Sequence, residues 1–203
     1  MLVDEPDGGE LDAYSSVNVD DRAGARAAAA HLVALGHRRI AVFTVGPADP
    51  PPGDWFVPQQ RMRGWLDVLE PAGIAPVVLH LDRDVEDERV GAARELLTGP
   101  DRPTAVICFS DSLAADVLRA AADLGLGVPG DLSVVGFDDA PLALRLSPPL
   151  TTVKQDVDAK GSLAAAELLK AVRRRRAAEP ERVRHHLLPT ELAVRGSTGP
   201  PAA

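Results

Sequence analysis

The sequence predicts an α/β fold, a parallel sheet with helices on both faces. Short apolar runs typical of buried strands alternate with longer segments whose apolar residues recur three and four positions apart, as on one side of a helix. This alternation is the pattern of parallel βαβ units. With 203 residues, of which 45% are hydrophobic, the chain is long enough for one large domain or for two lobes with separate cores.

In the first half of the chain, each expected element has its own local signal. Asp20 or Asp21 is a suitable N-cap for an Ala-rich helix that Gly36 ends. The segment 46–53 contains four prolines and is expected to be a loop. Beyond it, an amphipathic helix carries an apolar stripe formed by Met62, Trp65, Leu66 and Leu69. The expected strands are 17–19, 40–44 and 77–81.

The alternation continues to residue 139 and then changes. A helix with Val90 and Leu97 inward precedes a strand at 104–109, and a second helix begins at Asp111. A strand from Leu132 then ends at two consecutive carboxylates. The remaining expected elements are an extended connector at 153–155, a long helix at 156–176, strands at 186–188 and 191–194, and a frayed tail at 196–203.

Composition excludes several classes of function. The net charge of -8 and the pI near 5.1 argue against direct binding of this chain to DNA, which needs clustered Lys and Arg. Arg173 to Arg176 are explained as the solvated end of a helix. The single cysteine, Cys108, lies in an apolar run and is expected to be a buried, inert thiol. The acidic first residues do not form a secretion signal, and no run is long enough to span a membrane, so a cytoplasmic protein is expected.

Polar residues follow several of the predicted strands. Because parallel strands point one way, Ser110, Asp111, Asp138 and Asp139 are expected at one edge of the sheet, where open α/β folds bind ligands. Arg61, at the start of the helix after the Pro-rich loop, is expected at the same edge. A guanidinium and a carboxylate on opposite sides of a ligand can hold a polyhydroxylated molecule.

Two aromatic residues are candidates for the same site. Trp55 and Phe56 precede Arg61 and would supply an apolar face for a sugar ring or a base. The chain as a whole is expected to bind its ligand through Arg61, Asp138, Ser110, Asp111, Trp55 and Phe56.

Each candidate also has a purely structural interpretation. Asp111 could also be a helix N-cap, and Asp138 could also cap a turn. Arg61 could also be an exposed surface arginine, and Trp55 could also be a residue that covers the surface of a lobe. If Arg61 and Asp138 hold the ligand, Arg61→Ala and Asp138→Ala are each expected to abolish binding with a modest change in stability.

The sequence contains no known catalytic pattern. It lacks a dinucleotide-binding glycine motif, a phosphate-binding loop, a nucleophile elbow and a zinc-protease motif. The pair His185 and His186 has no further ligand at metal-binding spacing and is explained as a solvated strand end. We therefore expect no catalytic residue, no metal and no cofactor.

Several segments together resemble the LacI/GalR family of bacterial transcription regulators. The most specific is 132–139, Leu-Ser-Val-Val-Gly-Phe-Asp-Asp, followed by Pro-Pro-Leu-Thr-Thr-Val at 148–153. The matching segments, in family order, are 17–21 with Gly24, 31–40, 61–65, 102–106, 110–114, 128–139, 149–153 and 191–197.

The resemblance implies a type I periplasmic-binding-protein-like fold whose two lobes close on a small effector. It also implies that Arg61 and Asp138 contact that effector. Ser110 stands where sugar-responsive members usually have Asn, so its hydrogen bonding to the ligand is expected to differ. The Pro-rich loop leaves the identity of the effector open.

The resemblance also predicts an incomplete chain, because family members begin with a helix-turn-helix domain and the first elements of the N-terminal lobe. A deletion variant, a misassigned start codon or a gene remnant would each explain this. The predicted divisions are 1–20, a remnant of the N-terminal lobe with the first crossover strand; 21–149, the complete C-terminal lobe; 150–188, the N-terminal-lobe helix with crossover strands; and 189–203, a return strand and disordered tail. Such a partial lobe would expose an unpaired sheet edge.

The sequence therefore predicts the effector-binding region of an allosteric, sugar-responsive repressor. We expect a homodimer that contacts DNA only through the helix-turn-helix domain that this chain lacks, and no membrane partner. One alternative is a soluble sugar-binding protein of the transport type. Another is an enzyme that uses Asp138 and Asp139 as an acid/base pair, although adjacent residues at a strand end tend to point apart.

Overall fold

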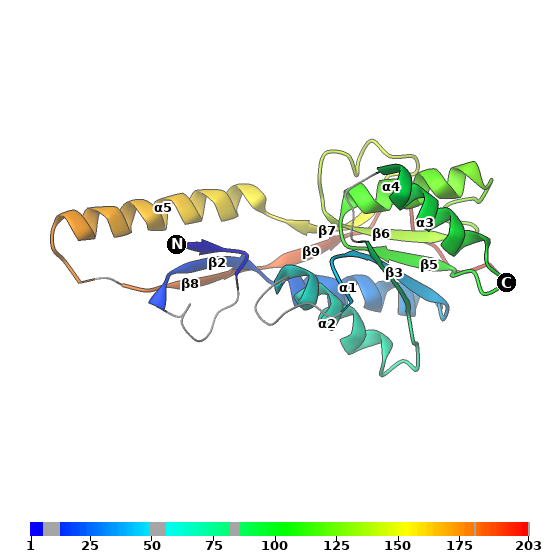
Figure 1. The fold of residues 1–203 in the computed structure, drawn as a ribbon, viewed down its shortest axis with the longest axis horizontal. Coiled ribbons are helices and arrows are strands. Elements are labelled where there is room, and N and C mark those ends of the chain that lie inside the picture. The colour runs from blue at the N-terminus through cyan, green and yellow to red at the C-terminus, as the bar shows by residue number, and fades with distance from the viewer. Residues whose placement is uncertain (6–12, 49–55, 82–85, 181, 203) are drawn as a thin grey trace.

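Two sheets of different size organise the chain (Figure 1). The computed structural model describes residues 1–5, 13–48, 56–81, 86–180 and 182–202. The large sheet has the spatial order β4-β3-β5-β6-β7-β9, and all its neighbouring strands are parallel except β7 and β9. Its strands are β3 (Ile40–Val45), β4 (Val77–Leu81), β5 (Ala105–Cys108), β6 (Ser133–Asp138), β7 (Thr151–Gln155) and β9 (Thr190–Ala193).

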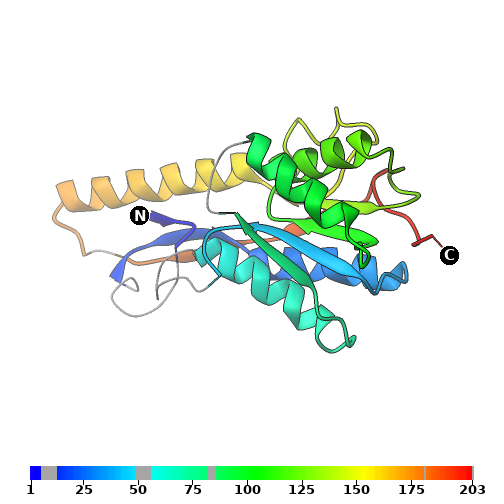
Figure 2. The same ribbon diagram turned by 45° about the vertical axis from the view of Figure 1, so that its right-hand side comes forward.

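Helices cover both faces of the large sheet (Figures 1 and 2). Because side chains alternate along a strand, Val42 and Ile107 face one core while Phe43 and Cys108 face the other. The first core includes α1 (Asp21–Ala34) and α2 (Phe56–Leu69), and the second includes α3 (Glu86–Thr98) and α4 (Asp111–Asp123). The predicted α/β class is confirmed.

Small residues allow α1 and α2 to pack closely. Asp20 is the N-cap of α1, since its side chain accepts a hydrogen bond from the Ala23 amide at 2.9 Å. A Cβ atom on Gly64 would lie 2.4 Å from the carbonyl oxygen of Arg22, so this position of α2 requires glycine. The close approach places the first turn of α1 beside the middle of α2, which is where the candidate site is built.

The small sheet lies beyond one end of the large sheet. It consists of β1 (Leu2–Val3), β2 (Ser16–Val19) and β8 (His185–Leu188), all parallel, in the order β1-β2-β8. The helix α5 (Val157–Arg176) runs along it (Figure 1). Leu168, Leu169 and Leu187 are exposed there, and Glu167 is the one buried residue of α5. This part of the described chain thus has a thinner core than the large sheet.

The chain passes between the two sheets three times: from β2 to α1, from β7 to α5, and from β8 to β9. Residues 153–155, expected to be an extended connector, are extended and lead to α5, but they also belong to β7, which is hydrogen-bonded between β6 and β9. Thr151 and Thr152, which weaken the apolar pattern of this strand, are fully buried because their hydroxyl groups have partners.

The C-terminal segment is ordered, contrary to the expected frayed tail. Ser197 is fully buried and its hydroxyl links β6 to β7, donating to the carbonyl of Val134 at 2.6 Å and accepting from the Thr151 amide at 2.8 Å. Buried His37 contacts the Gly199 carbonyl at 2.9 Å. Specific side-chain hydrogen bonds, which hydropathy does not reveal, hold this segment in place.

Two further features of the described residues bear on function. No helix among them combines the length and the apolar character needed to cross a bilayer. Cys108 is fully buried, and burial raises the pKa of its thiol well above the ordinary value, which keeps it protonated.

Candidate functional site

Arg61 is buried at the carboxyl edge of the large sheet, the edge at which β5 and β6 end. Its side chain is 5% exposed, and its Nε donates a hydrogen bond to Asp21 Oδ1 at 2.8 Å. A second nitrogen donates to the carbonyl of Phe109, directly after β5. The guanidinium also lies over the rings of Phe109 and Phe137, at 4.4 and 3.6 Å from their centroids. The surface interpretation of Arg61 is therefore wrong.

Asp138 lies beside Arg61 at the end of β6. Its Oδ1 is 3.5 Å from Arg61 Nη2 and accepts a hydrogen bond from Gln155 Nε2 at 2.6 Å. Burial raises the pKa of Asp138, while Arg61 and Gln155 lower it. The Asp138 side chain is 34% exposed. It is therefore held in place by its neighbours and is still accessible to a ligand. The structure thus brings together the guanidinium and the carboxylate that the sequence placed at one edge.

Ser110 and Asp111 have different roles from those expected. Ser110 is the N-cap of α4, accepting a hydrogen bond from the Leu113 amide at 3.3 Å, so the N-cap interpretation of Asp111 is wrong. Asp111 is buried; it accepts hydrogen bonds from Thr152 Oγ1 at 2.5 Å and from the Ala140 amide at 2.7 Å. Burial raises the pKa of Asp111 to about 6. Asp111 therefore ties the loop after Asp138 to α4 and β7.

Of the two aromatic candidates, only Phe56 belongs to the described residues, and it is not joined to this group. Phe56 is the first residue of α2 and is partly buried, but five helical positions turn its direction by about 140° from that of Arg61. Trp55 lies outside the described residues. Phe109 and Phe137 are the aromatic side chains that contact Arg61, and sequence reasoning assigned both to buried strands.

Asp139 faces a different partner from its neighbour. Its Oδ1 accepts a hydrogen bond from Arg195 at 2.5 Å, and Arg195 also donates to the carbonyl of Leu150. Both Asp138 and Asp139 have positive φ angles, 115° and 57°, so the backbone turns sharply between them. The two carboxylates therefore point to separate arginines, which does not favour an acid/base pair.

Sequence reasoning missed several residues of this site. Asp21 was considered only as an N-cap, although it is the carboxylate closest to Arg61. Gln155 was not considered as a site residue because its segment, 153–155, was assigned to an extended connector. The small sheet contributes an ion pair between Asp4 and Lys160, 156 positions apart, for which no local pattern existed. We call Arg61, Asp21, Asp138, Gln155, Asp4 and Lys160 the Arg61 cluster.

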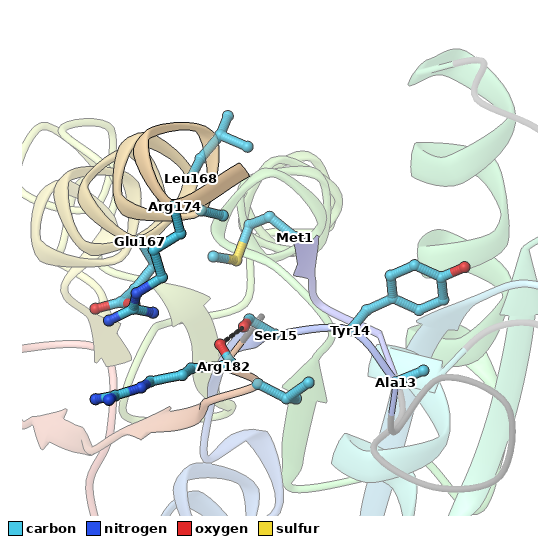
Figure 3. A pocket seen from close by; sticks show the side chains of 10 residues that line it. Met1, Ala13, Tyr14, Ser15, Glu167, Leu168, Arg174 and Arg182 are labelled. Carbon is cyan, nitrogen blue, oxygen red and sulfur yellow. Dashed lines mark hydrogen bonds between the residues drawn. The ribbon is translucent and has the colours of Figure 1, made fainter. Parts of the chain in front are cut away.

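A cavity of about 170 Å³ lies at the far end of the small sheet, under the second half of α5 (Figure 3). Its lining includes Tyr14, Ser15 and Leu168, and Glu167, which is held by Lys170 at 2.7 Å. It is smaller than typical ligand pockets of roughly 300–1,000 Å³. The Arg61 cluster, at the opposite end of α5, remains the better candidate.

Histidines near this cavity do not assemble a metal site. His185 Nδ1 lies 3.0 Å from Ser16 Oγ, and His186 Nε2 lies 3.8 Å from Glu167. Over the described ranges, no group of three or more His, Cys, Asp or Glu side chains is arranged to hold a metal ion.

Comparisons with known proteins agree with this geometry. Residues 29–198 match the family described as "Periplasmic binding protein-like domain". The HTH-type transcriptional regulator reg1 of Streptomyces lividans is 41% identical over 203 residues, covering 93% of this chain and 55% of that protein. The chain thus spans about half the length of this regulator.

Solved structures with bound sugars have the same fold. The complex of the transcriptional regulator CelR with cellobiose has a TM-score of 0.80 and 32% identity, covering 96% of this chain and 57% of that one. A LacI family transcriptional regulator from Enterococcus faecium with bound ribose has a TM-score of 0.80 and 27% identity, covering 98% of this chain and 69% of that one. The chain belongs to the periplasmic binding protein-like domains of the LacI family.

Proposed function

We propose that this chain is the effector-binding part of a LacI-type transcription regulator and that it binds a small hydroxyl-rich ligand, a sugar or a sugar derivative, at the Arg61 cluster. The observation that carries the proposal is the pairing of Arg61 with Asp138 at the carboxyl edge of the large sheet. That edge is where open α/β folds bind their ligands.

The chemistry of the two side chains suits a sugar. Asp138 accepts hydrogen bonds from ligand hydroxyl groups, and Arg61 donates to ligand oxygens. Arg61 is held by Asp21, Phe109 and Phe137, so little conformational freedom remains to be lost on binding. The ribose and cellobiose complexes of structural relatives support the same ligand class.

The proposal includes an allosteric step and no catalysed reaction. Gln155 and Lys160 lie at the passage from β7 to α5, so a ligand on the Arg61 cluster contacts the path that joins the two sheets. Ligand binding would favour one arrangement of the sheets over another. In a homodimeric cytoplasmic regulator, that arrangement would set the spacing of two DNA-reading domains, which lie in the part of such proteins that this chain does not span.

The test is a thermal-shift screen of the 203-residue chain with ribose, cellobiose, other neutral sugars, nucleosides and phosphorylated sugars. A ligand at about 100 times its Kd stabilises the folded state by about 2.7 kcal/mol. Asp138→Asn should weaken binding of the active sugar by about 1.5–3 kcal/mol, since a hydrogen bond to a charged acceptor becomes neutral. Asparagine is preferable to alanine because Asp138 has a positive φ, which Asn tolerates better.

The matched control is Asp123→Asn, which removes one exposed carboxylate from the end of α4, paired there with Arg94. This control should bind the sugar like the unmodified chain. An equal thermal shift in all three proteins would place the ligand elsewhere, and no shift with any sugar would refute the proposed function.

A further inference from the structure

An ion pair joins the small sheet to α5 beside the proposed ligand site. Lys160 Nζ lies 2.8 and 3.0 Å from the two carboxylate oxygens of Asp4. Asp4 directly follows β1, and Lys160 is the fourth residue of α5. The Lys160 side chain is 14% exposed and that of Asp4 is 36% exposed, so the lysine end of the pair is the more sheltered one.

The fold fixes the position of Asp4. The backbone of Asp4 is in the left-handed region, with φ of 58°. The buried side chain of Asn18 holds the next residue, donating to the Glu5 carbonyl at 2.9 Å and accepting from the Glu5 amide at 3.3 Å. The Asn18 side chain thus makes two hydrogen bonds to the Glu5 backbone, as a neighbouring strand would. These bonds hold the backbone next to Asp4, whose carboxylate pairs with Lys160.

The charge of Lys160 lies near the ligand site, because Lys160 is in the first turn of α5, five residues after Gln155, whose side chain donates a hydrogen bond to Asp138. Burial raises the pKa of Asp21 and of Asp138, and in both cases the positive charge of Lys160 acts in the opposite direction. Asp4 in turn contributes to raising the pKa of Asp21. Lys160 and Asp4 are therefore electrostatically part of the Arg61 cluster, although Lys160 comes from α5 and Asp4 from the end of β1.

The Arg61 cluster holds more carboxylates than cations. Arg61 is neutralised mainly by Asp21, at 2.8 Å, and Lys160 by Asp4. Asp138 shares Arg61 at 3.5 Å and otherwise has the neutral amide of Gln155. Nearby Asp139 is paired with Arg195, so it neither adds nor removes net charge. The site is left with an excess negative charge centred on Asp138.

We propose that Lys160 is a specificity-determining residue whose pairing with Asp4 makes the site accept neutral polyhydroxylated ligands and reject ligands that carry a phosphate or carboxylate. This inference rests on the proposed function and narrows its ligand class. A sugar hydroxyl can donate a hydrogen bond to the Asp138 carboxylate and accept one from the Arg61 guanidinium, so it suits both the anion and the cation of the site.

A phosphate group, unlike a sugar hydroxyl, cannot donate a hydrogen bond to Asp138 when it is fully ionised. It carries a charge of about −1.5 to −2 at pH 7 and can only accept hydrogen bonds when fully ionised. In this site it would face Asp138, and it would gain a cation only by displacing Asp4 from Lys160. The displaced carboxylate of Asp4, whose side chain is 36% exposed, would then lose its partner.

The test frees Lys160 by Asp4→Asn, a substitution of the same shape that tolerates the positive φ. Isothermal titrations measure ribose, ribose 5-phosphate and inorganic phosphate against the full 203-residue chain. We expect the unmodified chain to prefer ribose to ribose 5-phosphate by at least about tenfold, and Asp4→Asn to shift that ratio toward the phosphate by about tenfold. Asp4→Asn should also bind inorganic phosphate more tightly than the unmodified chain does.

Two controls separate a freed lysine from a general loss of negative charge. Asp123→Asn makes the same change in net charge away from the site and should gain no affinity for phosphate. The double variant Asp4→Asn, Lys160→Met should lose the gain made by Asp4→Asn, because the freed cation is removed.

The inference is overturned if the unmodified chain binds ribose 5-phosphate as tightly as ribose, or if Asp4→Asn gains no affinity for inorganic phosphate. Failure of the proposed function gives a different result, the absence of binding by any sugar in the thermal-shift screen. In that case, the titrations with inorganic phosphate still test whether Asp4 neutralises Lys160. A gain in phosphate affinity by Asp4→Asn would support this role of Asp4, and no gain would refute it.

Discussion

Arg61 and Asp21 form a buried ion pair that joins the middle of α2 to the first turn of α1. The Nε–Oδ1 distance is 2.8 Å, and the two side chains are 5% and 3% exposed. Because Arg61 also lies 3.5 Å from Asp138, the arginine proposed to contact the ligand also neutralises a buried carboxylate. The proposed function and the stability of the chain therefore involve the same guanidinium.

Arg61→Ala should destabilise the unliganded chain by about 3–5 kcal/mol, because it leaves the buried carboxylate of Asp21 without a counter-ion. This changes the expectation, drawn from the sequence, of a modest effect on stability. Urea unfolding followed by circular dichroism measures it. The double variant Arg61→Met, Asp21→Asn should recover much of the loss, since both charges are removed. If Arg61→Ala alone has the stability of the unmodified chain, the pair contributes nothing to folding.

Asp111 should lower stability as the pH rises. Its pKa is raised by burial from the ordinary 3.8 to about 6 in the folded chain, so the folded state holds a proton that the unfolded state has lost between these values. The contribution of protonated Asp111 to the free energy of unfolding is therefore fully present below about pH 4 and is lost as the pH rises through about 6. A difference of about two between these pKa values corresponds to about 3 kcal/mol.

The variant Asp111→Asn isolates this effect. Its unfolding free energy minus that of the unmodified chain should increase between pH 4 and pH 7, because the other carboxylates titrate in both proteins. Any lost hydrogen bond to Thr152 or Ala140 adds a constant that does not depend on pH. Urea titrations at several pH values measure the difference. A difference that stays flat with pH would show that burial does not penalise the Asp111 carboxylate.

The large sheet and part of the candidate site could be predicted because they depend on short-range patterns. Strand runs such as β5 and β6 are apolar, and the rule that parallel strands end at one edge was sufficient to place Asp138 near Arg61. The same rule grouped Ser110 and Asp111 with them but could not distinguish a cap from a buried acceptor, because both are polar residues at the start of a helix.

The remaining features depend on contacts between distant residues. Asp4 and Lys160 meet across 156 positions, and nothing in the sequence around either residue indicates a partner. The strand β7 begins with two buried threonines whose hydroxyl groups are bound by Thr198 and Asp111. Such side-chain pairings decide burial after the fold has formed, so hydropathy patterns do not reveal them.

Ser197→Ala should destabilise the chain by about 1–3 kcal/mol, although only six residues follow Ser197 in this sequence. The hydroxyl bridges the Val134 carbonyl and the Thr151 amide on adjacent strands, and alanine would leave both buried groups unsatisfied. Ser162→Ala, on the exposed side of α5, is the matched control and should change the urea midpoint little. Equal midpoints for Ser197→Ala and the unmodified chain would mean that the C-terminal segment is not held by this hydroxyl. A loss confined to Ser197→Ala would establish the segment as part of the large-sheet core, which positions Asp138 through β6.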